Sequence, residues 1–402
     1  MSESVLVINA GSSSIKYQLV DVETRAALAS GLIERIGESM STLTHKNQAG
    51  ADPIKVVVEE PLPTHTDGLR LMLAQFEANG PDLEAGHLVG VGHRVVQGAN
   101  VYSAATLITP EVEASIKELI PLAPLHNPPN LMGIEAAREA FPDLPQVAVF
   151  DTAFHQTLPP AAYTYAIDPQ VAKKLKIRRY GFHGTSHQFV SREAAVLIDR
   201  PAALLNLITI HIGSGCSIAA VRGGKSVETS MGLTPLEGLV MGSRSGDIDP
   251  ALVFHLVRAG GYSVDEVDQL LNKKSGLVGM CGSLDVRDIH RAISQGDQTA
   301  RLALDVFTHR LRHYIGGYAA QLGRVDALVF TAGIGENDPI TRREALQGLE
   351  VLGVKLDQEA NEATRGVAGC ISAKDSAVQV WVIPTNEEYE IAHQADDLIN
   401  AL

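Results

Sequence analysis

A strand, a short polar turn and a second strand occur twice in the chain, and this repeat constrains the fold more than any other feature. The first copy is centred on the turn from Asn9 to Ser14, and the second on the turn from Gly213 to Ser217. Apolar residues on both sides of a small polar turn are typical of a β-hairpin. The repeat predicts an α/β protein of two halves with similar build, each with a polar turn that faces a common cleft. We place the boundary near residues 150–152.

Other segments predict the elements that complete these halves. Apolar, β-rich runs indicate strands at 88–91, 147–150, 326–331 and 378–383, and a last helix closes the chain. A helix is expected at 109–120, because Thr109 can cap it and Pro110 suits its first turn. Four prolines within 121–129 predict a rigid loop, since proline breaks the interior of a helix.

The composition excludes several classes of function. Lys and Arg number 33 against 47 Asp and Glu, a net charge of −14, which argues against nucleic-acid and membrane-surface partners. The three cysteines are odd in number and far apart, so neither a disulfide framework nor a zinc site is expected. The N-terminal residues lack the pattern of a signal peptide, and no apolar run is long enough to span a membrane. We therefore expect a cytoplasmic protein.

Three turns of small residues follow apolar strands, at 9–14, 213–217 and 333–337. Phosphate oxygens can reach backbone N–H groups closely where side chains are small. None of the turns has the spacing of a Walker A loop or of a dinucleotide-binding G-x-G-x-x-G, and no G-x-S-x-G nucleophile elbow occurs. A single glycine turn is usually only a turn, but three after buried strands favour a phosphate-binding site.

Two arginines lie among glycines near the ends of predicted strands or turns. Arg94 stands in GHRVVQG, and Arg244 in GSRSGDIDP. A guanidinium binds carboxylate or phosphate through two parallel hydrogen bonds. Either arginine could bind an anionic substrate. The alternative for Arg244 is a structural ion pair with Asp247 or Asp249.

Carboxylates and histidines complete the candidates. Asp151 and Glu387 each follow a predicted strand, which suits a hard divalent cation such as Mg²⁺. His126, His183 and His211 lie in polar or glycine-rich segments, where each could serve catalysis or only make structural hydrogen bonds.

Taken together, these segments resemble the acetate kinase (acetokinase) family, within the superfamily of sugar kinases, actin and heat-shock chaperone ATPases. The matching stretches, in order, are VLVINAGSSSIKYQLVD, GHRVVQG, PLAPLHNPPNL, VAVFDTAFHQTLP, RRYGFHGTSH, SMGLTPLEGLVMGSRSGDIDP, FTAGIGEN and IPTNEE. The resemblance implies a two-domain actin-like ATPase, with a duplicated ribonuclease H-like βββαβαβα core and a cleft between the domains. Residues 1–150, completed by the helix 386–402, would form the acyl-substrate and metal side, and residues 151–385 the nucleotide-binding domain.

The resemblance also implies an activity. The family transfers the γ-phosphoryl group of ATP reversibly to acetate, giving ADP and acetyl phosphate, and we expect direct in-line transfer. It implies Mg²⁺, for which Mn²⁺ can substitute, and a homodimer. Two alternatives stay open: a propionate or other short-chain fatty acid kinase, and a non-catalytic, chaperone-like nucleotide-binding protein on the same fold.

Residue roles follow from the resemblance, position by position. Asn9 and Glu387 match the metal-site residues, and Lys16 would hold nucleotide phosphates. For the substrate, Arg94 is expected to bind the carboxylate and Val96 to contact the methyl group. Around the phosphoryl group we expect His183 and Arg244, with His126 beside that group, and Asp151 as a further catalytic residue. Asp151 matches a proton donor or acceptor of the family. The substrate acid, with a pKa of about 4, is already ionised at neutral pH and needs no base, so we expect an orienting or metal-linked role for Asp151.

The nucleotide would lie on three segments of the second half. The residues expected there are His211, Ile212, Gly213, Ser214, Gly215, Asp285, Val286, Arg287, Gly333, Ile334, Gly335, Glu336 and Asn337. Two positions depart from the family pattern: Ser214 stands where Asn is usual, and Gln97 where His is common.

Overall fold

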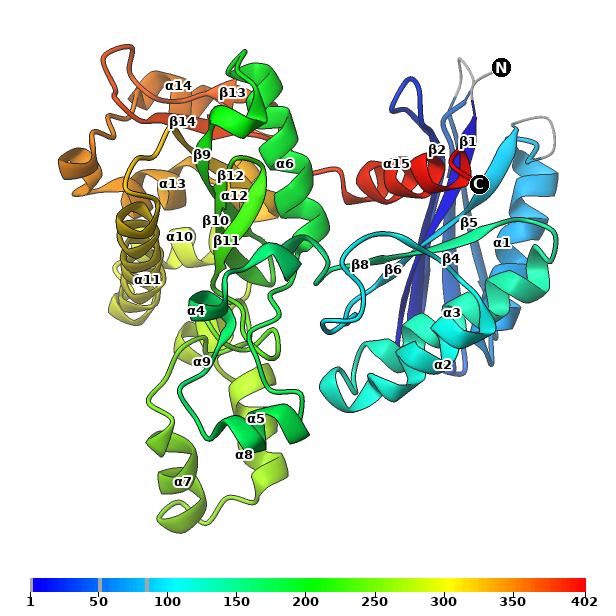
Figure 1. Ribbon diagram of the computed structural model, residues 1–402, viewed down its shortest axis with the longest axis horizontal. Helices are drawn as coiled ribbons and strands as arrows, with labels where there is room; N and C mark the ends of the chain where they lie inside the picture. The colour runs from blue at the N-terminus through cyan, green and yellow to red at the C-terminus, as the bar shows by residue number, and fades with distance from the viewer. Residues whose placement is uncertain (1–2, 50–52, 84–86) are drawn as a thin grey trace. The chain divides into compact units, whose positions relative to one another are not determined.

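The computed structural model describes residues 3–49, 53–83 and 87–402. The chain divides into two compact units, each drawn in Figure 1. The first unit comprises Met1–Ala153 and Asn386–Leu402, and the second comprises Phe154–Thr385.

The first unit is built on an eight-stranded sheet with the order β5-β4-β3-β2-β1-β6-β8-β7. The strands are β1 (Ser4–Gly11), β2 (Ser14–Asp21), β3 (Ala27–Glu34), β4 (Ser41–Asn47), β5 (Ile54–Glu60), β6 (Leu88–Val95), β7 (Thr106–Leu107) and β8 (Gln146–Phe150). The hairpin predicted at the N-terminus is confirmed, because β1 and β2 pair antiparallel. Strands β6 and β8 then add in parallel on the other side of β1.

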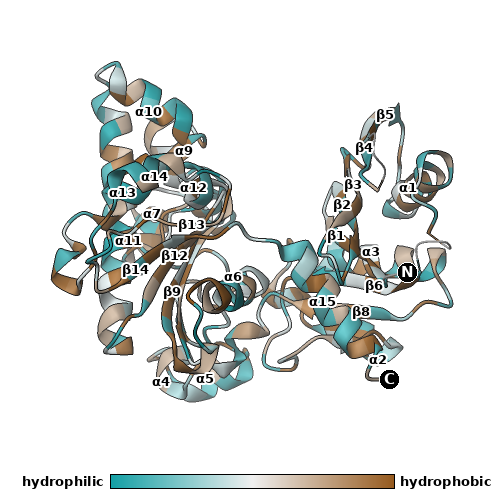
Figure 2. Cartoon of the chain, turned by 90° about the horizontal axis from the view of Figure 1, so that it is seen from above, coloured by the Kyte–Doolittle hydropathy of each residue, from teal (hydrophilic) through white to brown (hydrophobic). Residues whose placement is uncertain are grey.

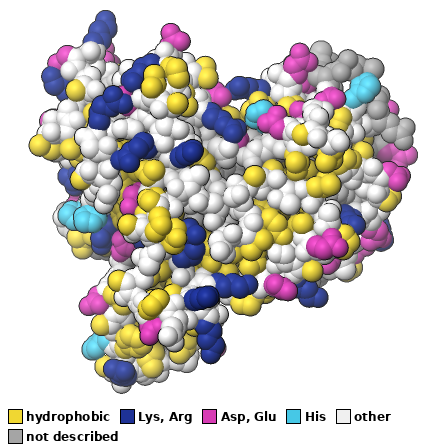
Figure 3. All heavy atoms as spheres, in the orientation of Figure 1, with side chains coloured by type: hydrophobic (Ala, Val, Ile, Leu, Met, Phe, Trp, Pro, Cys, Tyr) yellow, Lys and Arg dark blue, Asp and Glu magenta, His cyan; other side chains and the backbone are white. Residues whose placement is uncertain are grey.

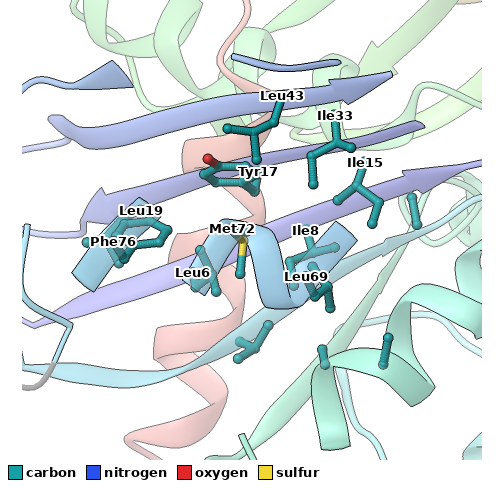
Figure 4. Close-up of a cluster of buried hydrophobic side chains, with 14 of the residues drawn as sticks. Leu6, Ile8, Ile15, Tyr17, Leu19, Ile33, Leu43, Leu69, Met72 and Phe76 are labelled. Carbon is teal, nitrogen blue, oxygen red and sulfur yellow. The ribbon is translucent and has the colours of Figure 1, made fainter. Parts of the chain in front are cut away.

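Helices cover both faces of this sheet. They are α1 (His65–Asn79), α2 (Pro110–Glu118), α3 (Asn127–Ala140) and α15 (Glu387–Ile399). Helices α1 and α3 lie on one face, and α15 packs against β1, β6 and β8 on the other (Figure 1). Figure 4 shows the core beneath α1, where alternate residues of β1 and β2 meet Leu69, Met72 and Phe76. Since side chains alternate along a strand, Val5, Val7 and Asn9 of β1 face α15.

The proline-rich segment differs from the expected rigid loop. Residues Ile120–Leu122 form one 3₁₀ turn, and α3 begins at Asn127 with Pro128 and Pro129 in its first turn. Proline is tolerated there because the first N–H groups of a helix have no partner within it. The prediction of a loop through 129 was therefore wrong at its end. The neighbouring helix α2 is confirmed, with Thr109 as its N-cap.

The second unit repeats the strand order of the first. Its strands are β9 (Asn206–Ile212), β10 (Cys216–Arg222), β11 (Lys225–Thr229), β12 (Ala327–Thr331), β13 (Gly369–Cys370) and β14 (Gln379–Val382), in the order β11-β10-β9-β12-β14-β13. Three antiparallel strands are followed by two parallel ones, as in β3-β2-β1-β6-β8. This duplication confirms the predicted actin-like core.

Helices pack on both faces of the second sheet. The helices are α4 (Pro160–Tyr163), α5 (Pro169–Lys174), α6 (Gly184–Leu197), α7 (Ala251–Arg258), α8 (Val264–Lys273), α9 (Gly276–Cys281), α10 (Val286–Ser294), α11 (Gln298–Leu322), α12 (Ala332–Asn337), α13 (Pro339–Leu346) and α14 (Gln358–Ala363), with 3₁₀ turns at Phe154–Thr157, Ala202–Leu204 and Leu349–Leu352. Helix α6 contacts β9 through Thr209 and His211, whereas α11 packs against β9 and β10 from the opposite face. Figure 2 shows the apolar strands between these polar-faced helices. The turn predicted at 333–337 is a helical turn, α12.

The surface carries both signs of charge despite the acidic total. Figure 3 shows Lys and Arg as well as Asp and Glu side chains on the drawn face of each unit. Basic side chains are therefore available to an anionic ligand. Within residues 3–49, 53–83 and 87–402, no helix combines the length and apolar character that crossing a bilayer requires.

Candidate active site

In the first unit, an arginine and an aspartate pair at the ends of neighbouring parallel strands. Arg94 of β6 donates from Nε to Asp151 Oδ1 at 2.9 Å and from Nη2 to Asp151 Oδ2 at 2.7 Å. The Asp151 side chain is 1% exposed and that of Arg94 22%. Such a bidentate pair holds the guanidinium in one orientation. Asp151 therefore orients Arg94.

Two glycines bring the start of α15 to this pair. A Cβ at Gly90 would lie 2.4 Å from Ile399 Cδ1, and a Cβ at Gly92 would lie 2.9 Å from Ile391 Cγ2. Gly90, Gly92 and Arg94 share one face of β6, because their spacing is two residues. The helix can lie close to the strand only where side chains are absent, and its first turn then comes beside Arg94.

Glu387 in that first turn is half-buried, and one of its carboxylate oxygens is buried without a matching donor. Its Oε1 has no hydrogen-bond partner among the described residues. Burial raises the pKa of Glu387 to about 7; Asp151 and Glu388 raise it too, against the opposing charges of Arg94 and Lys16. A buried oxygen with no donor is costly, and a cation would satisfy it.

Asn9 and Lys16 approach the same region from the first hairpin. The two residues are direct partners across β1 and β2, and Lys16 forms an ion pair with Glu388 of α15. Asn9 lies on the face of β1 that α15 covers. The described residues contain no group of three His, Cys, Asp or Glu side chains able to hold a metal. Magnesium commonly takes one or two carboxylates and completes its shell with water and substrate phosphate.

The raised pKa of Glu387 gives a pH prediction for the metal-free protein. The protonated form is favoured in the folded state, so its stabilising contribution is present below about pH 4.5 and is lost as pH rises through about 7. We expect a loss of about 3 kcal/mol over this range, measured as a falling thermal midpoint in EDTA. Glu387→Gln should flatten this dependence, whereas Glu139→Gln, at an exposed position, should not. The same slope in wild type and Glu387→Gln would contradict the prediction.

Two asparagines that the sequence analysis did not single out organise the segment after Arg94. Asn130 accepts from Val96 N at 3.0 Å and donates to Ala10 O at 2.9 Å. Asn127 accepts from Gln97 N at 3.1 Å and donates to Gln97 O at 3.0 Å. Their place in the HNPPN stretch, at the start of a helix, was the signal that could have found them.

The remaining predicted residues of this unit lie around those asparagines. Val96 is 6% exposed. His126 is half-buried and occupies the N-cap of α3 without capping it through its side chain. Gln97, at the position where His is common, is buried; its Oε1 accepts from Ala99 N at 2.9 Å.

In the second unit, His183 and Arg244 approach one turn. A Cβ at Gly215 would lie 3.2 Å from His183 Cε1 and 3.7 Å from Arg244 Nη1, so both side chains lie close to this glycine. His183 also stacks on His211, with ring centroids 4.2 Å apart. His183 has φ of +55°, a left-handed conformation that costs a non-glycine residue free energy and is common at functional sites.

The alternative role for Arg244 is wrong. Its Nη1 donates to Pro235 O at 2.9 Å, while Asp247 accepts from Gly238 N and from Tyr314 Oη, and Asp249 accepts from Ala251 N. Arg244 is therefore not held in an ion pair with either aspartate. Burial lowers the pKa of Arg244, yet a guanidinium stays charged at neutral pH.

A pocket of about 850 Å³ in the second unit joins the predicted nucleotide segments. Of the predicted residues, its walls contain Gly213, Ser214, Asp285, Val286, Arg287, Gly333, Ile334 and Asn337. The volume lies in the usual range for small-molecule sites. The walls do not include His211, Ile212, Gly215, Gly335 and Glu336. Ile212 is fully buried, and Glu336 Oε1 instead accepts from Thr385 N at 3.0 Å.

A buried arginine that the sequence analysis missed supports one wall of this pocket. Arg342 is fully buried and donates from Nη1 to Gly335 O at 2.9 Å and to Glu336 O at 3.0 Å. It also donates from Nη2 to Thr364 O at 2.8 Å. These bonds tie α12 to the segment after α14. No sequence pattern around Arg342 could have predicted that its side chain bonds to backbone carbonyl groups, because an arginine in the first turns of a helix is usually exposed.

Known proteins resemble the chain over nearly its full length. The model of the acetokinase family matches residues 4–393. A Leifsonia xyli protein named acetate kinase is 56% identical over 98% of this chain and 98% of its own, and one from Streptomyces coelicolor is 53% identical over 99% and 98%. The crystal structure of Porphyromonas gingivalis acetate kinase has a TM-score of 0.93 at 43% identity, covering 99% of each chain. A propionate kinase from Francisella tularensis has a TM-score of 0.91 at 41% identity, covering 99% of this chain and all of its own.

Proposed function

We propose that this chain, which belongs to the acetokinase family, transfers the γ-phosphoryl group of ATP reversibly to acetate, giving ADP and acetyl phosphate. The observation that carries this proposal is the convergence of His183 and Arg244 on Gly215, next to Gly213 and Ser214 of the pocket wall. A nucleotide in that pocket would place its phosphates towards two basic side chains.

Arg94 is proposed to bind the carboxylate of the acid. A guanidinium has five N–H donors, and Asp151 takes two of them, so three are left for a substrate anion. Acetate is ionised at neutral pH and needs no general base. Asp151 then acts by keeping Arg94 in place, rather than by moving a proton.

The oxygen donors beside Arg94 fit a magnesium ion. Asn9 and Glu387 would hold it, with Glu387 Oε1 as the buried oxygen that now has no donor, and Mn²⁺ can substitute. When bound, the ion would supply positive charge to the phosphates of the nucleotide. Lys16, on the strand beside Asn9, would add a further positive charge.

The second unit would stabilise the phosphoryl group during direct in-line transfer. Charge in this transition state is spread over three equatorial oxygens, and catalysis consists mainly of positioning and charge stabilisation. His183 and Arg244 would donate to those oxygens, and His126 of the first unit would lie beside them. The acid-binding and metal residues would belong to 1–150 and 386–402, and the nucleotide residues to 151–385.

Acid-dependent release of ADP tests this function against the alternatives. With ATP and Mg²⁺, ADP should form only when acetate is added, and kcat/KM should fall from acetate to propionate to butyrate. ADP release independent of any acid would instead indicate the chaperone-like alternative. A kcat/KM for propionate above that for acetate would indicate a propionate kinase, the name carried by the Francisella relative.

The choice of acid is predicted to depend on Val96. Val96→Ala should enlarge the methyl pocket and raise kcat/KM for propionate relative to acetate by about 10-fold, because one methylene contributes about 1–3 kcal/mol. Initial rates with both acids measure the ratio. Val91→Ala, in the core under α3, is the control that should lower stability without changing the ratio. An unchanged ratio in Val96→Ala would remove Val96 from the pocket.

We further propose that the chain is a homodimer in the cytoplasm. Light scattering after size exclusion should give about twice the 42.9 kDa of one chain. A single-chain mass across micromolar concentrations would contradict the dimer.

A further inference from the structure

His183 begins a chain of hydrogen bonds that runs through the interior of the second unit. His183 Nδ1 lies 2.9 Å from Ser217 Oγ, and His187 Nε2 lies 2.8 Å from the same oxygen. His187 Nδ1 in turn lies 2.7 Å from Thr209 Oγ1, and Thr209 Oγ1 donates to Ala219 O at 3.5 Å. Ser217 thus joins two histidines that lie four residues apart at the start of α6.

The register of β9 and β10 builds this chain. Ala219 is the direct partner of Thr209, and Ser217 is the direct partner of His211. Both pairs point to the face that α6 covers. Ser217, His187 and Thr209 are each fully buried, so water does not replace these bonds.

We infer the direction of the bonds from the last acceptor, Ala219 O, which lies at the long distance of 3.5 Å from Thr209 Oγ1. A backbone carbonyl can only accept, so Thr209 donates to Ala219 O and accepts from His187 Nδ1. His187 is neutral, because burial, together with His155 and His211, holds its pKa well below the usual range. A neutral imidazole has one N–H, so His187 Nε2 accepts from Ser217 Oγ. Ser217 Oγ must then accept from His183 Nδ1.

We propose that Ser217 is a positioning residue that holds His183 as the Nδ1–H tautomer and aims its Nε2 edge at Gly215. A Cβ at Gly215 would lie 3.3 Å from His183 Nε2, which fixes the direction of that edge. This inference rests on the proposed role of His183 at the phosphoryl group. With its proton at Nδ1, a neutral His183 presents a lone pair to phosphoryl oxygens, so His183 donates to them only when it is protonated at both nitrogens.

The charged and titratable groups around His183 come from three elements. His211 of β9 stacks on it, Arg244 lies beside the same Gly215, and His187 of α6 is joined to it through Ser217. Arg244 disfavours a second positive charge, whereas the phosphoryl group favours it. Ser217 Oγ accepts from Nδ1 in both states of His183 and so keeps the ring in place as the charge changes.

Ser217→Ala removes the acceptor and frees the tautomer. We expect kcat to fall about 10–100-fold with KM for ATP changed less than about threefold, and the alkaline limb of the kcat profile to change position. Ser217→Thr, which keeps the hydroxyl, should restore both the rate and the profile. Ser41→Ala is the matched control: Ser41 is equally buried, and its Oγ donates to Arg35 O at 2.9 Å in the first unit, apart from His183 and its partners. It should keep the wild-type kcat and profile.

Histidine ¹⁵N NMR of the resting protein supplies a readout that does not depend on activity. His183, assigned by its loss in His183→Gln, should show a protonated Nδ1 in wild type and a mixture of tautomers in Ser217→Ala. An Nε2–H tautomer in wild type, or a Ser217→Ala enzyme with unchanged kcat and pH profile, would overturn the proposal. Equal losses in Ser217→Ala and Ser41→Ala would also overturn it, as a packing effect. Full activity in His183→Gln would instead reject the proposed role of His183 and leave the tautomer assignment standing.

Discussion

Arg244→Ala is expected to lower kcat by about 10²–10³-fold while the Kd for ATP changes little. Arg244 is half-buried beside Gly215, where it would meet the charge that grows in the proposed transition state. Among the residues that the structure describes, its side chain bonds only to Pro235 O and the sulfur of Met241, so removing it leaves none of their carboxylates unpaired. Steady-state rates and nucleotide titrations separate the two effects.

Two further variants sharpen this test. Arg244→Lys keeps the charge but loses the planar fork, and should recover only part of the rate. Arg258→Ala removes an exposed arginine of the same unit that lies over Phe254, and should leave kcat unchanged. A folded Arg244→Ala enzyme with kcat within about threefold of wild type would contradict the proposed role.

Arg94→Ala is expected to impair both stability and use of the acid. It leaves Asp151, 1% exposed, without its partner, and we expect a loss of about 2–4 kcal/mol in the free energy of unfolding, measured by thermal and denaturant unfolding. KM for acetate should rise more than 10-fold, because the donors for the carboxylate are gone. KM for ATP, whose proposed site is the pocket of the second unit, should change much less.

The double variant Arg94→Ala with Asp151→Ala separates structure from function. Removing both charges should recover much of the lost stability, since no buried carboxylate is left unpaired. Activity should stay low. Recovery of acetate KM together with stability would show that Arg94 only neutralises Asp151.

The core of the fold could be predicted because local pattern determines it. The two hairpins are visible as alternating apolar residues around Asn9–Ser14 and Gly213–Ser217, and the structure confirms both. The start of α3 was missed because prolines usually end helices. Pro128 and Pro129 are tolerated here because they lie in the first turn, where the backbone N–H groups have no partner within the helix. The packing of α15 against Gly90 and Gly92 brings together residues about 300 positions apart in the sequence, and no local pattern reveals such a contact.

The site divides in the same way. Arg94, Asp151 and Glu387 could be named from strand ends, and the structure places the three around one point of the first unit. Ser217 and Arg342 could not be named. Ser217 reaches its histidine partners only because the register of β9 and β10 turns it towards α6. Arg342 is placed by bonds to backbone carbonyl groups of two separate segments. Such roles exist only in the folded chain.

Trapping of acetyl phosphate with hydroxylamine tests the proposed function most directly. Protein, ATP, Mg²⁺ and acetate are incubated with hydroxylamine, and acetohydroxamate is measured by its ferric complex. The hydroxamate should form at the rate of ADP release, should be absent when any one of the four is omitted, and should fall with Arg244→Ala. Folded protein that binds ATP but yields no hydroxamate above the blank would contradict phosphoryl transfer to acetate.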